Sequence, residues 1–259
     1  MAGMALDLQG PVQVLHQGRS ARLQLLANLA PGTRIELPAG ARASLSLYAS
    51  RSIYRLTGPG LVEVTGDGLK VIHGAAPQVR SMGEKQVAAA QTGNLIPGAY
   101  RMRALQLARK VVLTAPETGS VLLDTRPHFA WEAADDAPYT VTLQAEAGGL
   151  RYSTVVQGKR WTLPEGIQLD HGKSYDWTVS YTSPANGEKQ SAGGRFSLAT
   201  QDEAAQLRAL RPAEADPVED WVFYAVMLQQ RQMRAEARGA WHHIARQRPD
   251  LERAADLAR

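Results

Sequence analysis

The side chains that could carry acid–base or metal chemistry are few in this sequence and lie far apart. Six histidines are present: His16, His73, His128, His171, His242 and His243. Only the last two are close in the sequence, and adjacent residues of a helix point in different directions. No pair shows the His-x-x-x-His spacing, or a similar one, that holds a metal ion. The histidines therefore predict no metal site.

Asp135 and Asp136 are an acidic pair that calcium could use. They lie within residues 132–138, which we expect to form a loop between strands, and no third acidic ligand follows in register. A solvated turn is the simpler interpretation. The sequence also lacks a Gly-x-Ser-x-Gly elbow, a phosphate-binding loop and a Gly-x-Gly-x-x-Gly motif after a strand. We predict that the chain is not an enzyme and has no catalytic residue, cofactor or metal.

Length and composition indicate a folded chain of more than one domain. With 259 residues, 44% of them hydrophobic, the chain can bury two or three cores of ordinary size. It contains no cysteine, which excludes disulfides, thiol catalysis and cysteine metal sites. No run approaches the roughly 18–20 apolar residues that span a bilayer, so we expect the chain as given not to span a membrane.

The clearest element is a strand at residues 174–179. Tyr175, Trp177 and Val179 alternate with small polar residues, which places the large apolar groups on one face. Gly148-Gly149 and Asn186-Gly187 mark hairpin turns on either side of it. We therefore predict a two-sheet β-sandwich over residues 111–200, with a core formed by Trp131, Tyr139, Val141, Leu143, Trp161, Tyr175, Trp177 and Phe196. These aromatic residues could instead form a sugar-stacking platform, but their phase on alternating strands favours a buried core.

This segment resembles the fibronectin type III and immunoglobulin-like domains of bacterial envelope proteins. The resemblance rests on Pro127-His128-Phe129-Ala130-Trp131, on Tyr175-Asp176-Trp177-Thr178-Val179 and on Phe196-Ser197-Leu198. The absence of cysteine excludes antibody-type domains with their disulfide and leaves the cysteine-free relatives.

Residues 5–75 indicate a second all-β unit built from many short strands. Apolar residues alternate over runs of four to six residues, and turn signals such as Gly66-Asp67-Gly68 separate the runs. The segment resembles the FecR domain, a β-rich periplasmic module. The matching stretches are Gly10-Pro11-Val12-Gln13-Val14, Leu29-Ala30-Pro31-Gly32-Thr33-Arg34-Ile35, Gly40-Ala41-Arg42-Ala43-Ser44-Leu45-Ser46-Leu47 and Ser52-Ile53-Tyr54-Arg55-Leu56-Thr57-Gly58-Pro59-Gly60. The usual transmembrane helix and the sigma-factor-binding segment of FecR sensors are not in this sequence, so the resemblance implies the fold rather than the sigma-regulator role.

Charge is distributed unevenly along the chain. Residues 1–110 contain 13 Lys/Arg and 5 Asp/Glu, a net charge of +8, against −3 for residues 111–200 and −1 for residues 201–259. Basic residues are frequent at the end of the first segment, at Arg101, Arg103, Arg109 and Lys110. They fit either a strip for an anionic partner or an edge strand, on which Lys and Arg deter unwanted pairing. We favour the edge strand.

The apolar period changes after residue 200, which predicts two helices. Trp221, Tyr224 and Leu228 recur at helical spacing after Asp216-Pro217, and a second helix is expected from about Arg234 to Gln247, before Pro249. The pair resembles one tetratricopeptide-type helical hairpin, in Tyr224, Ala237, Trp241 and Pro249. Its large apolar side chains exceed what one hairpin hides, so we expect it to dock on the sandwich or to face a partner. The candidate partner-facing residues are Trp221, Phe223, Tyr224, Met227 and Trp241.

Together these patterns predict a mainly β chain with a C-terminal α-helical hairpin. The expected domains are residues 1–78 (FecR-like β domain), 79–110 (linker and basic edge strand), 111–200 (immunoglobulin/fibronectin type III-like sandwich) and 201–259 (helical hairpin). The resemblances imply a periplasmic or otherwise extracytoplasmic bacterial protein, with a signal sequence or anchor removed before residue 1.

The expected function is non-catalytic: binding or scaffolding a protein partner in a signalling or assembly complex of the cell envelope. The alternatives are a module for peptidoglycan or another glycan, and nucleic-acid binding through the basic N-terminal segment. Exposed coplanar aromatic residues would favour the glycan. Buried aromatic residues beside an open strand edge would favour the protein.

Overall fold

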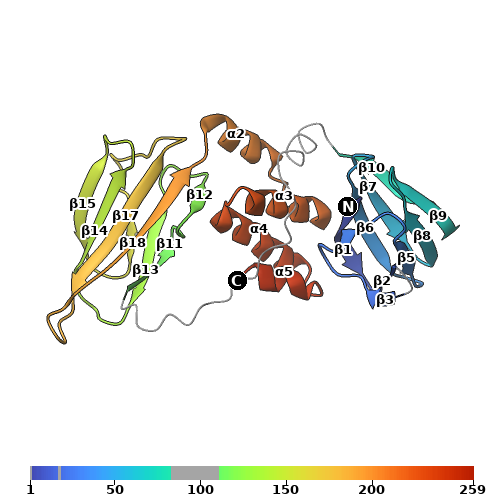
Figure 1. Ribbon diagram of the computed structural model, residues 1–259, viewed down its shortest axis with the longest axis horizontal. Coiled ribbons are helices and arrows are strands. Elements are labelled where there is room, and N and C mark those ends of the chain that lie inside the picture. Colours follow the sequence, from blue (N-terminus) through green and yellow to red (C-terminus); the bar gives the residue numbers. More distant parts are fainter. Residues whose placement is uncertain (1, 17–18, 83–110) are drawn as a thin grey trace. The chain divides into compact units, whose positions relative to one another are not determined.

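The computed structural model describes residues 2–16, 19–82 and 111–259, which form two compact units that are not continuous in sequence. The first unit combines the described residues of 1–97 with residues 210–227 and 237–259. The second unit combines the described residues of 98–209 with residues 228–236. The fold is mainly β, with several antiparallel sheets and a helical C-terminal segment, as the sequence predicts (Figure 1).

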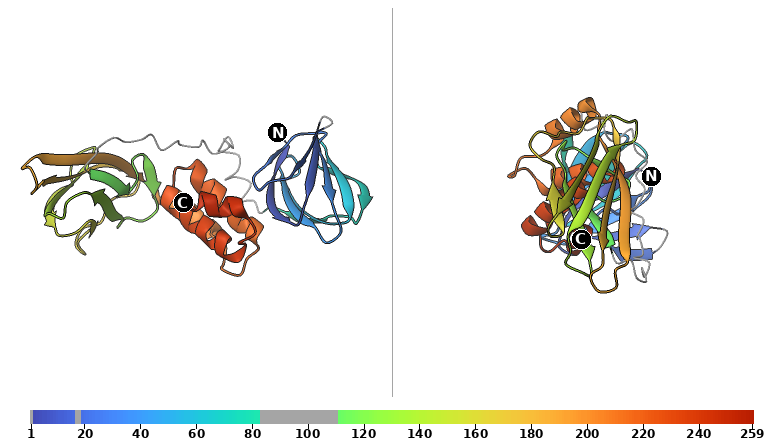
Figure 2. Two further views of the ribbon diagram at one scale, coloured as in Figure 1. Left: turned by 90° about the horizontal axis from the view of Figure 1, so that it is seen from below. Right: turned by 90° about the vertical axis from the view of Figure 1, so that its left-hand side faces the viewer.

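The first unit contains a β-sandwich of ten short strands in two sheets (Figures 1 and 2). The first sheet has the order β10-β7-β6-β1-β4, and its strands are β1 (Gly3–Gln9), β4 (Asn28–Leu29), β6 (Arg42–Leu47), β7 (Ser52–Thr57) and β10 (Gln78–Ser81). The second sheet has the order β3-β2-β5-β8-β9, and its strands are β2 (Gln13–His16), β3 (Arg19–Arg22), β5 (Arg34–Leu37), β8 (Gly60–Val64) and β9 (Leu69–Gly74). The predicted turn at residues 66–68 joins β8 and β9, which pair antiparallel.

The core of this sandwich follows the period-two pattern of the strands. On β6, Ala43, Leu45 and Leu47 pack with residues of the second sheet such as Ile35 and Val62. The register of β1 against β6 shifts between Ala5 and Asp7, which is a β-bulge. The bulge keeps Ala5 and Leu8 in the core and turns Met4 and Asp7 to the other face of the first sheet, opposite Ser46 and Ser44.

Four helices follow the strands: α2 (Gln201–Leu210), α3 (Val218–Gln230), α4 (Arg234–Gln247) and α5 (Glu252–Leu257). The sequence predicted α3 and α4 but not α2 or α5. α2 does carry a start signal, because the backbone N–H of Glu203 donates to Thr200 Oγ1 at 3.3 Å, as in a capping box.

The second unit holds the predicted sandwich of residues 111–200. The third sheet has the order β11-β13-β16, and its strands are β11 (Val111–Ala115), β13 (His128–Ala133) and β16 (Arg160–Thr162). The fourth sheet has the order β12-β18-β17-β14-β15, and its strands are β12 (Ser120–Leu122), β14 (Tyr139–Ala145), β15 (Arg151–Val156), β17 (Ser174–Thr182) and β18 (Lys189–Leu198). The predicted turns at residues 148–149 and 186–187 join β14 to β15 and β17 to β18.

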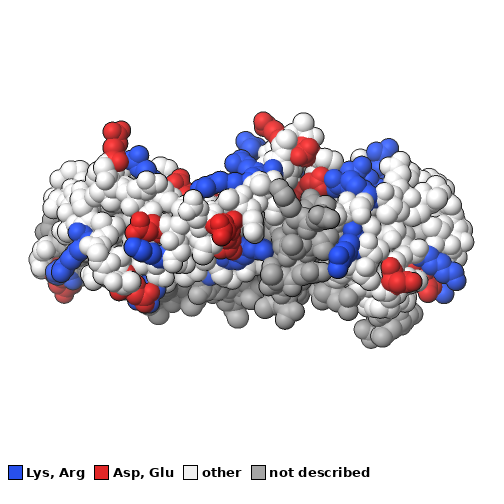
Figure 3. Space-filling view, turned by 90° about the horizontal axis from the view of Figure 1, so that it is seen from above, with Lys and Arg blue, Asp and Glu red and all other residues white. Residues whose placement is uncertain are grey.

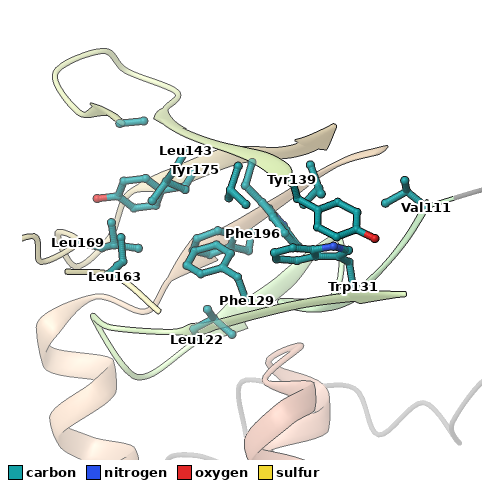
Figure 4. Packing of buried hydrophobic residues seen from close by; sticks show 14 of the residues in the cluster. Val111, Leu122, Phe129, Trp131, Tyr139, Leu143, Leu163, Leu169, Tyr175 and Phe196 are labelled. Atoms are coloured by element: carbon teal, nitrogen blue, oxygen red, sulfur yellow. The ribbon is translucent and has the colours of Figure 1, made fainter. Parts of the chain in front are cut away.

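All eight predicted core residues of this sandwich belong to its hydrophobic cluster, with Trp161 partly buried against it. Figure 4 shows five of them, Trp131, Tyr139, Leu143, Tyr175 and Phe196, packed around Phe129. Phe129 lies at the centre, with its ring 5.1 Å from that of Trp177 and 5.9 Å from that of Phe196. At the start of β17, the backbone N–H of Asp170 donates to the Tyr175 hydroxyl at 2.8 Å. This contact is the tyrosine corner of immunoglobulin-like and fibronectin type III-like sandwiches, and with the two-sheet topology it identifies that fold.

Candidate functional site

The five residues predicted to face a partner are buried within the chain. Trp221, Phe223, Tyr224, Met227 and Trp241 all have little exposed surface, so this prediction is corrected: the hairpin does not present them to a partner. The apolar excess noted in the sequence is covered internally. The ring of Trp221, for example, lies 4.0 Å from that of His243, and its Nε1–H donates to the Ala213 carbonyl at 3.1 Å.

The first sheet contacts the hairpin within the first unit, whereas from the sequence we favoured docking on the sandwich of residues 111–200. Arg55 of β7 donates from Nε to Glu219 Oε1 at 2.6 Å, and both are in the first unit. Arg80 of β10 forms a two-pronged pair with Asp220. Glu219 and Asp220 are only 4% and 8% exposed, in the first turn of α3, where the helix dipole favours negative charge.

A third contact ties the end of α4 to β1. Arg248 donates to Asp7 Oδ1 at 2.5 Å and to the Leu8 carbonyl at 2.7 Å, and it also holds Asp250 at 2.7–2.8 Å. Burial raises the pKa of Asp7 and outweighs the lowering by Arg248. The hydrogen bond from Arg248 lowers the pKa of Asp250, which is more exposed.

These pairs connect the charged residues of the face of the first sheet with residues of the opposite charge on the helices. Arg55 pairs with Ser44 in register and Arg80 with Ile53, so these side chains share the face that carries Met4 and Ser46. The acids are engaged by guanidinium groups, which suits a structural role better than proton transfer. The tip of the hairpin belongs to the second unit, where the backbone N–H of Leu123 donates to Glu236 Oε1 at 3.0 Å.

Asp135 is structural rather than simply solvated, which corrects the expectation for this loop. Its Oδ2 accepts hydrogen bonds from Ser183 Oγ at 2.7 Å and from the Tyr181 hydroxyl at 3.1 Å. Its carbonyl accepts one from the Tyr139 hydroxyl. Asp136 is exposed and pairs with Lys159 at 2.9 Å. Among the described residues, no three His, Asp or Glu side chains gather as a group that could hold a metal ion.

The predicted basic strip, Arg101, Arg103, Arg109 and Lys110, lies outside the described residues. β11 (Val111–Ala115), at the edge of the third sheet, begins directly after this strip. On the face in Figure 3, basic and acidic side chains of the described residues are interspersed rather than segregated by sign. No helix in the part of the chain that the structure describes is long and apolar enough to cross a membrane.

No other described element of its unit lies on the outer face of the fourth sheet, which consists mostly of small hydroxyl residues. The register aligns Ser153, Thr142 and Thr178 across three neighbouring strands, and Thr142 Oγ1 lies 3.2 Å from Ser153 Oγ. The next row of the ladder is charged: Arg195 forms a two-pronged pair with Asp176, at 2.8 and 3.0 Å, and also holds Glu146 at 2.6 Å. The guanidinium of Arg195 lowers the pKa of Asp176.

At one side of this face, strand β15 has a free edge. Among the described strands it pairs with β14 alone. Near its end lies Val155, which is the most exposed large hydrophobic residue of the described part, at 64%. We expected an open strand edge to favour a protein partner, but the sequence did not identify this strand.

The opposite edge of the fourth sheet, β18, is partly covered. Residues 120–122 pair parallel with its end as β12, and the Gly119 N–H donates to the Arg195 carbonyl at 2.7 Å. A Cβ on Gly194 would lie 2.6 Å from Thr118 Oγ1, so this segment runs close against β18.

The aromatic residues of the sandwich are mostly in its core. One nearly parallel pair, Tyr152 and Trp161, is half-buried at the margin, with ring centroids 5.8 Å apart and planes 8° apart. The two rings cover each other, and Trp161 also contacts Phe129 at 4.8 Å.

Comparison with solved structures gives fibronectin type III domains. The fn3 domain of the human collagen alpha-1(XX) chain is 17% identical, with 46% of this chain and 96% of that chain covered and a TM-score of 0.29. A Fn3-like protein from Clostridium thermocellum is 21% identical, covering 35% of this chain and 95% of that chain at a TM-score of 0.24. A two-domain fibronectin type III segment of chicken tenascin is 13% identical, covering 72% and 82%, also at 0.24.

No family model matches the sequence, and no curated protein matches it. The identification of the sandwich therefore rests on its own sheet order, core and tyrosine corner.

Proposed function

We propose that this chain is a non-catalytic protein-binding or scaffold module of the bacterial cell envelope. The observation that carries the proposal is the contrast within the second unit: the large aromatic side chains form the core, while a strand edge and a polar sheet face are bare. An open edge offers backbone donors and acceptors to a protein, which a sugar ring uses poorly.

The first unit supports a periplasmic setting through its resemblance to FecR domains. The Gly-x-Ala-x-Leu-x-Leu stretch that carries this resemblance forms β6, the central strand of the first sheet. The absence of cysteine is compatible with that compartment. Fractionation of cells that express the full-length protein tests this: recovery in the cytosolic fraction would contradict the envelope assignment.

Site-specific photo-crosslinking in intact cells tests the protein-binding function. A benzophenone amino acid at position 153 lies on the bare face of the fourth sheet, and the same group at the exposed position 132 lies on the third sheet. We expect a discrete protein adduct from position 153 and none from position 132. Equal labelling from both positions, or no protein adduct from either, would contradict the function.

Glycan binding is a second candidate, which the Tyr152–Trp161 pair favours because it is the one nearly parallel aromatic pair at the margin of the sandwich. Sedimentation with purified peptidoglycan tests it. Binding that is lost in Trp161→Ala, with the melting temperature little changed, would support the glycan over the protein.

A further inference from the structure

The free edge of β15 has the backbone geometry needed to accept another strand. The Ala145 N–H donates to the Leu150 carbonyl at 2.9 Å, which makes residues 145 and 150 a hydrogen-bonded pair. Such pairs alternate along an antiparallel ladder, and the register continues without a shift to Val156. Arg151, Ser153 and Val155 therefore turn their N–H and C=O groups away from β14, toward the open edge.

The other edges of the described sheets are short, irregular or partly covered. Five of the edge strands have two to four residues, namely β3, β4, β10, β12 and β16, and β12 covers only the end of β18. β9 is as long as β15, but its register shifts where Ile72 is the extra residue, and the register of β11 shifts near Thr114. Bulges and short lengths protect edges from pairing. β15, with six residues in unbroken register, lacks both protections.

Charge around this edge identifies the kind of strand it would accept. Residues 151–160, from β15 to the start of β16, contain three basic residues, Arg151, Lys159 and Arg160, and no acidic residue, and Glu146 before them pairs with Arg195. Lys159 is matched by Asp136, whereas Arg151 and Arg160 form no ion pair with any described residue. Opposite charges on neighbouring strands stabilise a pairing, and like charges oppose it.

We propose that the edge of β15 binds an extended, acidic segment of a partner protein as an additional strand of the fourth sheet. This inference rests on the proposed protein-binding function and specifies its site. Backbone hydrogen bonds from Arg151, Ser153 and Val155 hold the segment. The arginines select acidic side chains, and Val155 provides an apolar contact near the end of the strand.

Three fluorescein-labelled octapeptides test the proposal on the full chain by fluorescence anisotropy. The first alternates glutamate and valine, the second alternates lysine and valine, and the third is the first peptide with every second backbone nitrogen methylated. We expect the acidic peptide to bind at least about tenfold more tightly than either of the others. Equal binding of the methylated peptide would overturn strand addition, and equal binding of the basic peptide would overturn the charge selection. No binding of the acidic peptide would overturn both.

Two pairs of variants locate the site. Ser153→Pro removes an outward N–H from β15 and should weaken acidic-peptide binding by about tenfold or more. Ser191→Pro makes the same change on β18, where alternation also turns the backbone outward, and should leave binding unchanged. Arg151→Glu combined with Arg160→Glu should reverse the preference toward the basic peptide, whereas the single change Lys189→Glu on β18 should not. If Ser153→Pro does not fold, binding of the methylated peptide to the unsubstituted chain is the test of strand addition.

The crosslinking experiment separates failure of this inference from failure of the proposed function. A protein adduct at position 153 that persists in Arg151→Glu/Arg160→Glu, and that excess acidic peptide does not displace, would leave the protein-binding function standing and remove the β15 strand-addition site. Loss of the adduct under both treatments supports the inference.

Discussion

The first and fourth sheets have a similar polar face, which is buried on the first sheet and exposed on the fourth. Each has an apolar face in the core of a sandwich and another face that carries serine or threonine at its centre. On the first sheet that face is buried, and Ser46 is only 1% exposed. On the fourth sheet the equivalent face is bare, and Ser153 is exposed. Small hydroxyl residues therefore suit both a close approach of helices and contact with water, and their presence alone does not distinguish the two.

What distinguishes the two faces is the charge around the small residues. The first sheet surrounds its serines with Arg55, Arg80 and Asp7, each paired with a residue of opposite charge on the helical segment. On the fourth sheet, Arg195 instead finds its partners on the same face, in Asp176 and Glu146. Ion pairs between the first sheet and the helices hold these two layers together. Ion pairs within the face of the fourth sheet leave that face free to contact something else.

The largest effect is expected from removing the cover of the first sheet. Deletion of residues 201–259 should expose Ser46 and its apolar neighbours Met4 and Ile53, all of which are buried in the full chain. We expect the 1–200 fragment to aggregate or to melt at a lower temperature, because large exposed apolar patches associate. Size-exclusion chromatography and thermal melts measure this. A soluble fragment with an unchanged melting temperature would show that the helices do not stabilise the first unit.

Trp177→Ala should have the next largest effect, within the second unit. Trp177 is 1% exposed and packs edge-on against Phe129, so its removal should lower the free energy of unfolding by about 3–5 kcal/mol. Chemical denaturation measures the loss, with the neighbouring Thr178→Ala as the control. A loss below about 1 kcal/mol would mean that Trp177 is not a core residue.

Matched serine substitutions compare the two faces directly. Ser46→Leu places a large side chain where the structure leaves no room, and should cost about 1–3 kcal/mol of unfolding free energy. Ser153→Leu on the bare face should change it by no more than about 0.5 kcal/mol. Similar costs at both positions would contradict the difference between the two faces.

The smallest effect concerns two aspartates that pair with arginine. NMR titration of the side-chain carboxyl carbons should give Asp7 a pKa above 3.8, because burial dominates, and Asp176 a pKa below 3.8, because its hydrogen bonds to Arg195 dominate. The stabilising contribution of Asp7 is then complete below pH 3.8 and is lost as the pH rises through its raised pKa. That of Asp176 is present above pH 3.8 and is lost as the pH falls through its lowered pKa. Shifts in the same direction would be the contrary result.

The strands and the sandwich core could be predicted from the sequence because period-two alternation is local. The spacing of Tyr175, Trp177 and Val179 indicates the buried face of the strand without information from any distant residue. The apolar spacing within Arg234–Gln247 indicates a helix in the same way. Pairings of distant residues were not predictable. No residue near Arg55 indicates its ion pair with Glu219, which follows 164 residues later. The packing of the helices on the first sheet and the burial of Trp221 were therefore not predicted.

The candidate edge was missed for a related reason. In the sequence β15 resembles any strand of a hairpin, and only the sheet order shows that no described strand pairs with its other side. The three basic residues at positions 151–160 were available as a signal. Over the whole segment of residues 111–200 the net charge is −3, so a sum over that segment does not reveal these three basic residues.

The bond between Arg248 and Asp7, 241 residues apart, has a consequence for biosynthesis. A ribosome that adds roughly 5–20 residues per second needs some 10–50 s to pass from one to the other. The entire second sandwich, which has a hydrophobic core of its own, is made in that interval, while Met4 and Ile53 still await the helices that cover them. Newly made chain therefore displays an uncovered apolar sheet face for as long as synthesis lasts. A holding chaperone that binds exposed apolar surface would act on that face of the first sheet rather than on the sandwich that emerges after it.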